Sequence, residues 1–186
     1  MKSKKNDLKN KILKAIGKEV GIFLLYITIF AVVMVLLQTF VIQRTRVSGR
    51  SMEPTLSDGD VLFVDKISYN FSDPERFDII PFEYEDGVYY IKRIIGLPGE
   101  SVRIDESGII YINGEVLTES YGKEVIYDAG IAINEITLGD DEYFVLGDNR
   151  NNSQDSRSAN VGNIKRSDIM GRAFFRLSPL SKLGFL

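Results

Sequence analysis

The sequence contains no histidine and no cysteine. Without histidine, the chain cannot form a Ser-His-Asp triad, a histidine-ligated zinc site or a histidine general base. Without cysteine, it has no disulfide, no thiol nucleophile and no thiolate metal site. Acid-base chemistry must therefore use lysine, tyrosine or a carboxylate, and an exported domain would be held together by packing alone. The missing cysteines leave the redox compartment open.

Charge is distributed unevenly along the 186 residues. Residues 1–19 contain seven lysines and two acidic residues, a net charge of +5, whereas the remainder contains 16 basic and 24 acidic residues, a net charge of −8. An acidic domain disfavours nucleic acid as a partner. The same acidic excess also serves solubility, so it identifies no partner by itself.

Residues 20–42 read VGIFLLYITIFAVVMVLLQTFVI and carry no charge. At about 1.5 Å per residue, a helix of this length crosses a hydrocarbon core of about 30 Å. The apolar stretch is longer than the core of a cleavable signal peptide, and a buried soluble helix is the remaining alternative. Because lysines flank mainly its N-terminal side, we expect a cytoplasmic leader at 1–19 and an extracytoplasmic domain at 43–186 in a single-pass cell-membrane protein.

The pattern after Thr45 predicts a mainly β domain. Short β-rich stretches alternate with Gly, Pro, Asn and Asp, which favours a partly closed antiparallel β-barrel or sandwich behind an N-terminal transmembrane α-helix. The sharpest turn signal is Asn113-Gly114, which predicts a two-residue hairpin with both central residues at positive φ. The predicted strands cover residues 61–64, 78–84, 88–95, 101–104, 109–112, 115–118 and 142–146.

The segment VSGRSMEPTLSDGD, just beyond the apolar stretch, contains Ser51 among residues suited to a fixed, exposed turn. Gly49 permits close backbone approach, and Pro54 restricts both its own φ and the residue before it. Serine is common in surface loops, so an ordinary loop remains the alternative at this point.

The segment GVYYIKRIIGLPGESV places Lys92 inside an apolar strand, on the same face as Tyr90 and Ile94. A solvated, edge-protecting lysine is the ordinary interpretation of such a position. A buried lysine, in contrast, would have a lowered pKa, and its neutral amine could take the proton of the Ser51 hydroxyl. Two residues of types that can form a serine-lysine dyad are thus present.

A third segment, FVLGDNRNNSQDSRS, ends an apolar strand in a dense polar loop. It is either a hydrated turn or a support for the catalytic strand, with a serine bonded to the amine and an Asp-Arg pair bracing the backbone.

The ordered set SMEPTL, GDVLFVDK, YIKRIIGLPGE and GDNRNNSQDSR resembles the sequence boxes of bacterial type I signal peptidases. The resemblance runs from about Val47 to Arg157 and continues into GRAFFRLSP. It implies a serine endopeptidase with Ser51 as nucleophile and Lys92 as general base, without a cofactor or metal. The implied reaction is removal of signal peptides from exported preproteins, with small residues accepted before the cleaved bond.

The resemblance also implies roles for further residues. Ser153 would orient the lysine, and four charged residues of the same loop would support it: Asp148, Arg150, Asp155 and Arg157. The substrate pockets would be lined by Val47, Gly49, Met52, Leu56, Tyr90 and Ile91. Some relatives have a hydroxyl residue two positions before the nucleophile, where this chain has Gly49, so we assign no oxyanion role to Ser48.

The expected partners are preproteins with signal peptides and the lipid bilayer, with the export machinery left open and nucleic acid excluded. Only eight residues separate Gln43 from Ser51, a reach of about 30 Å at most. Phe174, Phe175 and Leu177 either touch lipid or form a final core strand. A different serine-lysine peptidase and a non-catalytic membrane-anchored β-domain that binds exported proteins are the alternative functions.

Overall fold

The computed structural model describes the backbone of residues 2–186, with side chains at Lys14, 16–35 and 41–186. The chain divides into a helical unit that ends at Val41 and a β-rich unit, Ile42–Leu186.

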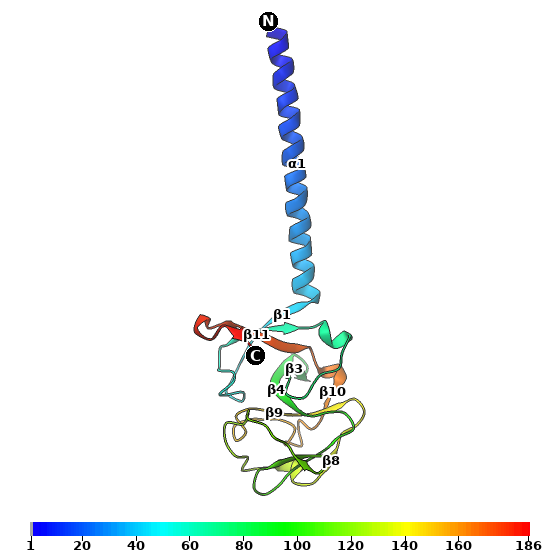
Figure 1. The fold of residues 1–186 in the computed structure, drawn as a ribbon, viewed down its shortest axis with the longest axis vertical. Helices are drawn as coiled ribbons and strands as arrows, with labels where there is room; N and C mark the ends of the chain where they lie inside the picture. The colour runs from blue at the N-terminus through cyan, green and yellow to red at the C-terminus, as the bar shows by residue number, and fades with distance from the viewer. Residues whose placement is uncertain (1) are drawn as a thin grey trace. The chain divides into compact units, whose positions relative to one another are not determined.

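The helical unit is one long helix, α1 (Lys2–Phe40), drawn in blue in Figure 1. Its segment Ile16–Val35 has a mean hydropathy of 2.1 and is not buried against the described chain. Twenty helical residues reach about 30 Å, so length and composition are typical of a membrane span. The helix also includes the lysine-rich leader, and Ile42, the last residue of the predicted apolar segment, instead begins the first strand.

The β unit contains two antiparallel sheets within its described residues (Figure 1). In the larger sheet the strand order is β1-β2-β11-β3-β4-β9-β10, with β12 paired to β11. Its strands are β1 (Ile42–Arg46), β2 (Val61–Asp65), β3 (Ile79–Glu85), β4 (Val88–Gly96), β9 (Glu142–Leu146), β10 (Ile164–Lys165), β11 (Arg172–Ser178) and β12 (Gly184–Phe185).

The smaller sheet has the order β7-β6-β5-β8. Its strands are β5 (Ser101–Ile104), β6 (Ile110–Ile112), β7 (Glu115–Val116) and β8 (Ile136–Thr137). Four short 3₁₀ helices complete the unit: η1 (Ser68–Asn70), η2 (Gly130–Ile133), η3 (Arg166–Asp168) and η4 (Leu180–Lys182). The mainly β, antiparallel fold class is confirmed, and within residues 42–186 neither sheet closes into a barrel.

The hairpin predicted at Asn113-Gly114 joins β6 to β7. Both residues have positive φ, 53° and 80°, as a tight two-residue turn requires. All seven predicted strands are present, with shifts of one or two residues at their ends. The pattern did not predict β1, β8, β10 or β12. β11, which lies between β2 and β3 in the larger sheet, is the strand that was the alternative to lipid contact for Phe174, Phe175 and Leu177.

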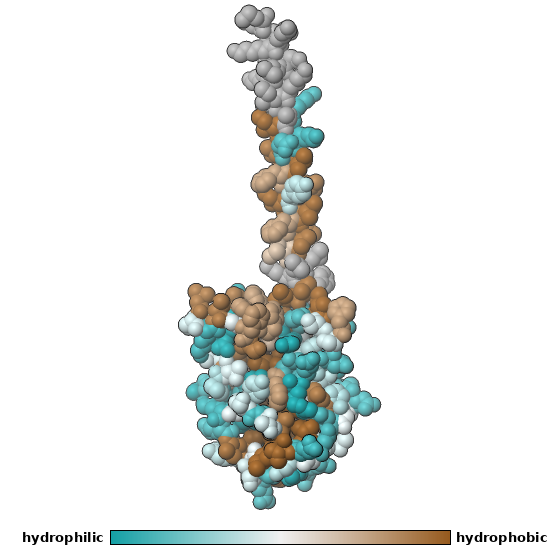
Figure 2. Space-filling view, in the orientation of Figure 1, coloured by the Kyte–Doolittle hydropathy of each residue, from teal (hydrophilic) through white to brown (hydrophobic). Residues whose placement is uncertain are grey.

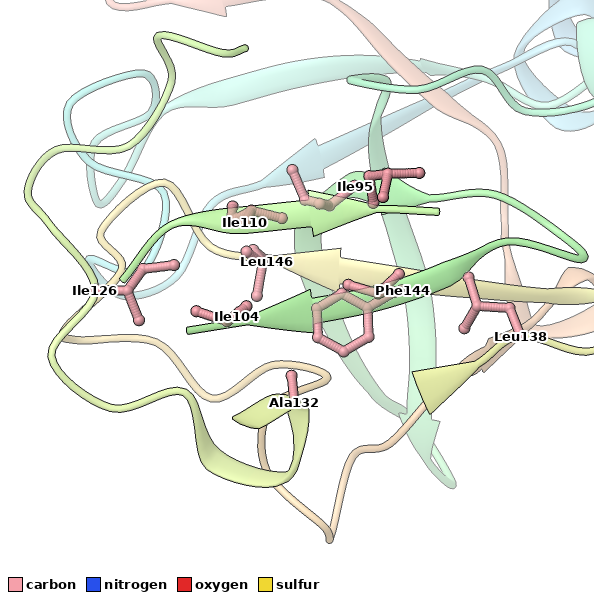
Figure 3. Packing of buried hydrophobic residues seen from close by; sticks show 10 residues of the cluster. Ile95, Ile104, Ile110, Ile126, Ala132, Leu138, Phe144 and Leu146 are labelled. Carbon is pink, nitrogen blue, oxygen red and sulfur yellow. The ribbon is translucent and has the colours of Figure 1, made fainter. Parts of the chain in front are cut away.

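The two sheets pack through one apolar cluster (Figure 3). Ile95 of β4 and Phe144 of β9 meet Ile104 and Ile110 of the smaller sheet. At Gly96 a Cβ atom would lie 2.6 Å from the Val102 side chain, so only glycine permits this approach. The sandwich-like core fixes β4 and β9, the strands that lead into the polar site.

Candidate active site

The segment that contains Ser51 is a closed loop between β1 and β2. Val47 N–H donates to the Asp60 carbonyl at 2.8 Å, and Gly59 N–H donates to the Val47 carbonyl at 3.0 Å. The loop is anchored from inside by Met52 and Leu56, which have almost no exposed surface. These contacts hold the half-buried Ser51 in one position, rather than at the tip of a free loop.

Lys92 reaches Ser51 from β4, where it lies opposite Ile80 of β3. The distance from its Nζ to Ser51 Oγ is 2.9 Å, and Nζ also lies 3.1 Å from the Ile91 carbonyl oxygen. The side chain is 4% exposed. The fold thus brings together the two residues that the sequence suggested as a dyad, although 41 positions separate them.

Burial lowers the pKa of Lys92 from 10.5 to about 8. Water would stabilise the ammonium form, and its exclusion favours the neutral amine. The negative charges of Asp155 and Asp148 raise the pKa and partly offset this effect. A substantial fraction of Lys92 is therefore neutral near physiological pH, as a general base must be.

Arg93, the next residue on β4, points to the opposite face and pairs with Asp148. Their side chains form a buried bidentate ion pair, with Nε–Oδ1 at 2.9 Å and Nη2–Oδ2 at 2.6 Å. A third contact, from Nη1 to the Phe77 carbonyl at 2.8 Å, satisfies the guanidinium further. Because the pair is buried and fully bonded, it ties β4 to the loop after β9 just beside Lys92.

Asp155 and Arg157 form a second bidentate pair, with Nε–Oδ1 and Nη2–Oδ2 distances of 2.9 Å. Asp155 also accepts the Gly147 N–H at 3.0 Å, and Arg157 donates to the carbonyls of Asp128 and Arg150. The pair therefore closes the loop 147–157 on itself.

Arg150 forms an ion pair with Glu119 at 2.7 Å and donates to the Gly147 carbonyl at 3.1 Å. Ser153 lies against Gly147, but its buried Oγ has no hydrogen-bond partner within the described residues. The hydrogen bond from Ser153 Oγ to Lys92 Nζ that the suggested orienting role requires is therefore not formed in this structure.

Sequence reasoning missed three residues that hold the loop 47–60, which carries Ser51. Asn149 donates from its backbone to the Ser51 carbonyl at 2.9 Å and from Nδ2 to the Arg50 carbonyl at 3.0 Å. Arg176 of β11 donates to the Thr55 carbonyl at 2.7 Å and pairs with Asp60 at 3.2 Å. Arg93 is the third. Nothing local in the sequence marks these contacts, which join segments up to 121 positions apart.

A cleft of about 560 Å³ opens at the dyad. Of the residues suggested as substrate-binding, those that line it are Val47, Gly49, Met52, Tyr90 and Ile91, together with Ser51 and Lys92. Leu56 does not line the cleft: it is fully buried in the core beneath the loop 47–60. The walls also include residues that the sequence did not suggest as substrate-binding, namely residues 43–46, Ser48, Arg50, Pro81, Tyr89, Asn152, Gln154 and Met170.

Two strands border the cleft with unpaired backbone edges. β1 is the last strand of its sheet and pairs only with β2. β4 pairs with β3 along its length, but β9 pairs only with its second half, from Arg93 onward. Residues 89–92 have no strand partner on that side among the described residues, although the Ile91 carbonyl oxygen lies 3.1 Å from Lys92 Nζ. An extended peptide could add to either edge. Within the described residues, no group of three His, Cys, Asp or Glu side chains could hold a metal ion.

Comparisons with known proteins agree on one family. The family model described as "Signal peptidase, peptidase S26" matches residues 20–178. A probable signal peptidase I-2 from Synechocystis sp. is 42% identical over 158 residues, which cover 81% of this chain and 69% of that protein. A probable signal peptidase I-1 from the same organism is 38% identical and covers 83% and 81%. A solved signal peptidase I structure from Enterococcus faecalis V583 aligns at 35% identity with 54% of this chain and 97% of its own, with a TM-score of 0.43.

Proposed function

The chain belongs to the signal peptidase family, peptidase S26, and we propose that Ser51 and Lys92 form the dyad with which it removes signal peptides from exported preproteins. One observation carries this assignment: the Nζ atom of a buried lysine lies 2.9 Å from a serine Oγ at the base of an open cleft. The chain belongs to a family of peptidases, which are hydrolases. The contact between Ser51 and Lys92 supports a serine endopeptidase mechanism within that family.

In the acylation step, the neutral Lys92 amine takes the hydroxyl proton of Ser51 while Oγ attacks the carbonyl carbon of the scissile bond. The ammonium that results gives its proton to the leaving nitrogen, so the peptide bond breaks and an ester of Ser51 remains. A water molecule then attacks the ester, Lys92 takes its proton, and the returning proton regenerates the serine hydroxyl. The Lys92 amine therefore accepts and returns the proton in both steps, and no second base is needed.

The Ser51 N–H is the proposed oxyanion donor. It makes no hydrogen bond within the described residues, so it is free to donate to the oxygen that gains negative charge. The carbonyl of the same residue is fixed by the Asn149 N–H at 2.9 Å. A donor held in this way needs little reorganisation as the charge develops.

The polar loop 147–157 acts as a support and not as a reacting group. Asp148 holds Arg93 beside the base, and the Asp155–Arg157 pair holds Gly147, against which Ser153 packs. The negative charges of Asp155 and Asp148 raise the pKa of Lys92, whereas burial lowers it. Arg150 completes the support through Glu119. Ser153 would turn toward Lys92 Nζ when the amine becomes charged, since its Oγ has no hydrogen-bond partner in the described part of the chain.

The substrate is proposed to bind as an extended strand between the open edges of β1 and β4. Side chains that alternate toward the interior would meet Val47, Met52, Tyr90 and Ile91, with Gly49 allowing the backbone to approach closely. The resemblance to the family implies shallow pockets beside Val47 and Met52, which are both almost buried. Shallow pockets favour small side chains such as alanine at the first and third positions before the bond.

Helix α1 is proposed as the membrane anchor, with the lysine-rich end in the cytoplasm and the β unit outside. This arrangement keeps the dyad near a substrate held in the same bilayer, which raises their effective concentration. The chain offers a direct topology test because it contains no cysteine. Single cysteines at Ser3 and Ser107 should react with an impermeant maleimide only at position 107 in intact cells; labelling at position 3 alone would reverse the orientation.

The β unit also carries an apolar surface suited to the bilayer (Figure 2). Phe63, Phe175 and Phe185 are cross-strand neighbours on β2, β11 and β12, with ring centroids 6.4 Å and 5.1 Å apart. Phe185 and Leu180 are each 83% exposed. Aromatic side chains are favoured at membrane interfaces. Contact with lipid at this surface would add to the hold of the anchor.

The decisive experiment incubates the purified full-length protein with a preprotein and with a version that has a bulky residue directly before the cleavage site. We expect cleavage of the first substrate only, and no cleavage by Ser51→Ala, Lys92→Ala or Lys92→Arg, because guanidinium stays protonated. Lys165→Arg, an exposed lysine on β10, is the matched control and should cleave normally. Cleavage by Ser51→Ala would remove the proposed nucleophile.

A further inference from the structure

The cleft is cationic in a domain that is acidic. Residues 42–186 contain 16 basic and 24 acidic residues. Among the described residues that line the cleft, however, Arg44, Arg46, Arg50 and Lys92 are basic and none is acidic. A positively charged cleft in a negatively charged domain points to a preference for substrates with negatively charged side chains.

Two of these four residues, Arg44 and Arg46, carry positive charge that no other described residue neutralises. The other two differ. Arg50 is bound to Glu53, with Nε–Oε1 at 2.9 Å. Lys92 has its pKa lowered to about 8 by burial. Arg44 and Arg46 are exposed, and neither forms an ion pair with a described residue. The available positive charge in the cleft therefore comes from β1.

The positions of the two arginines on β1 give the preference a direction. Side chains alternate along a strand, so Arg44 and Arg46 share one face, whereas Thr45 and Val47 share the other. The exposure pattern agrees: the two arginines are exposed, Thr45 is half-buried and Val47 is buried. A substrate strand added to the edge of β1 would have the same alternation.

We propose that Arg44 and Arg46 make the enzyme select acidic over basic side chains at the second and fourth residues before the cleaved bond. This inference rests on the proposed function, in which the first and third residues fill the pockets on the Val47 face. The residues between them then face Arg44 and Arg46. Opposite charges across adjacent strands attract, and like charges repel. Arg44 and Arg46 are thus specificity-determining residues that leave the reacting atoms untouched.

The test uses matched peptides that carry Glu, Gln or Lys singly at each of the four positions before the bond, with alanine at the first and third where these are not varied. The assay measures kcat/KM in a neutral detergent, so that lipid charge cannot contribute. At low ionic strength, we expect the Glu peptide to exceed the Lys peptide by about threefold to tenfold at the second and fourth positions. At the third position no such charge preference is expected. The preference should shrink in about 0.5 M salt.

Variants assign the effect to its source. Arg44→Gln with Arg46→Gln should bring the ratio of Glu to Lys cleavage close to one, and Arg44→Glu with Arg46→Glu should invert it. Arg103→Gln, on β5 of the smaller sheet, is the matched control and should retain the wild-type ratio. Equal cleavage of Glu and Lys peptides by the wild-type protein would overturn the inference, as would a ratio that survives in the glutamine variants. If no peptide is cleaved, the proposed peptidase function fails instead, so the two failures are distinguishable.

Discussion

The titration of Lys92 is the most direct consequence of the site. Its pKa is lowered from 10.5 to about 8, a difference of about 3 kcal/mol in favour of the neutral amine. At pH 7 about one-tenth of the enzyme would hold a neutral base, compared with about one molecule in 3,000 for an unshifted lysine. Burial thus raises the active fraction by about 300-fold at neutral pH.

We therefore expect kcat/KM to rise about tenfold per pH unit below pH 7.5 and to level off above about pH 9. The assay follows cleavage of one peptide from pH 6 to pH 10 at constant ionic strength. The peptide should contain no titratable side chains, so that any pH dependence of kcat/KM comes from the enzyme. The Lys165→Arg control should give the same midpoint, because that lysine is exposed on β10.

Three outcomes would refute this reasoning. A midpoint near 10.5 would mean that burial does not shift the base, and the structural argument for the dyad would lose its energetic part. A flat profile would mean that no group titrating in this range limits the reaction. A midpoint near 8 that is unchanged in a Lys92→Ala variant with residual activity would assign the titration to another group.

Three further predictions concern stability and packing. Lys92→Met should stabilise the folded protein by about 2–3 kcal/mol at pH 7, because charging the buried amine costs folding energy below its folded pKa. The wild-type protein should gain relative stability from about pH 8 to 10.5, so the difference shrinks over that range; a constant difference across thermal melts would contradict the cause. Asp148→Ala should lower the free energy of unfolding by about 3–5 kcal/mol, because it leaves Arg93 charged, buried and unpaired; denaturant unfolding without a change in midpoint would argue against this. Gly147→Ala should abolish cleavage, because its Cβ would lie 2.5 Å from the Ser51 carbonyl oxygen. Gly184→Ala is the control and should behave as wild type, because open space surrounds that position. An active Gly147→Ala enzyme would mean that the loop 147–157 can move away from Ser51.

The sequence predicted the local structure well wherever the determinants are local. Asn113-Gly114 forms the expected turn because its two residues tolerate positive φ whatever surrounds them. β1 was missed, and β11 was only one of two alternatives, for the opposite reason. Both consist of mixed polar and apolar residues, and they are strands because β2 lies between them and pairs with each.

The same distinction applies to the site. The absence of histidine and cysteine determined that any base had to come from lysine, tyrosine or a carboxylate, and the sequence boxes indicated which lysine and which serine. Only the tertiary structure decided that Lys92 faces inward, that Leu56 belongs to the core, and that Ser153 Oγ has no hydrogen-bond partner among the described residues. A residue's chemistry is fixed by its type, but its protonation state depends on which other segments exclude water from it. For Lys92 those segments come from distant parts of the chain, so folding, and not composition, lowers the pKa of its amine.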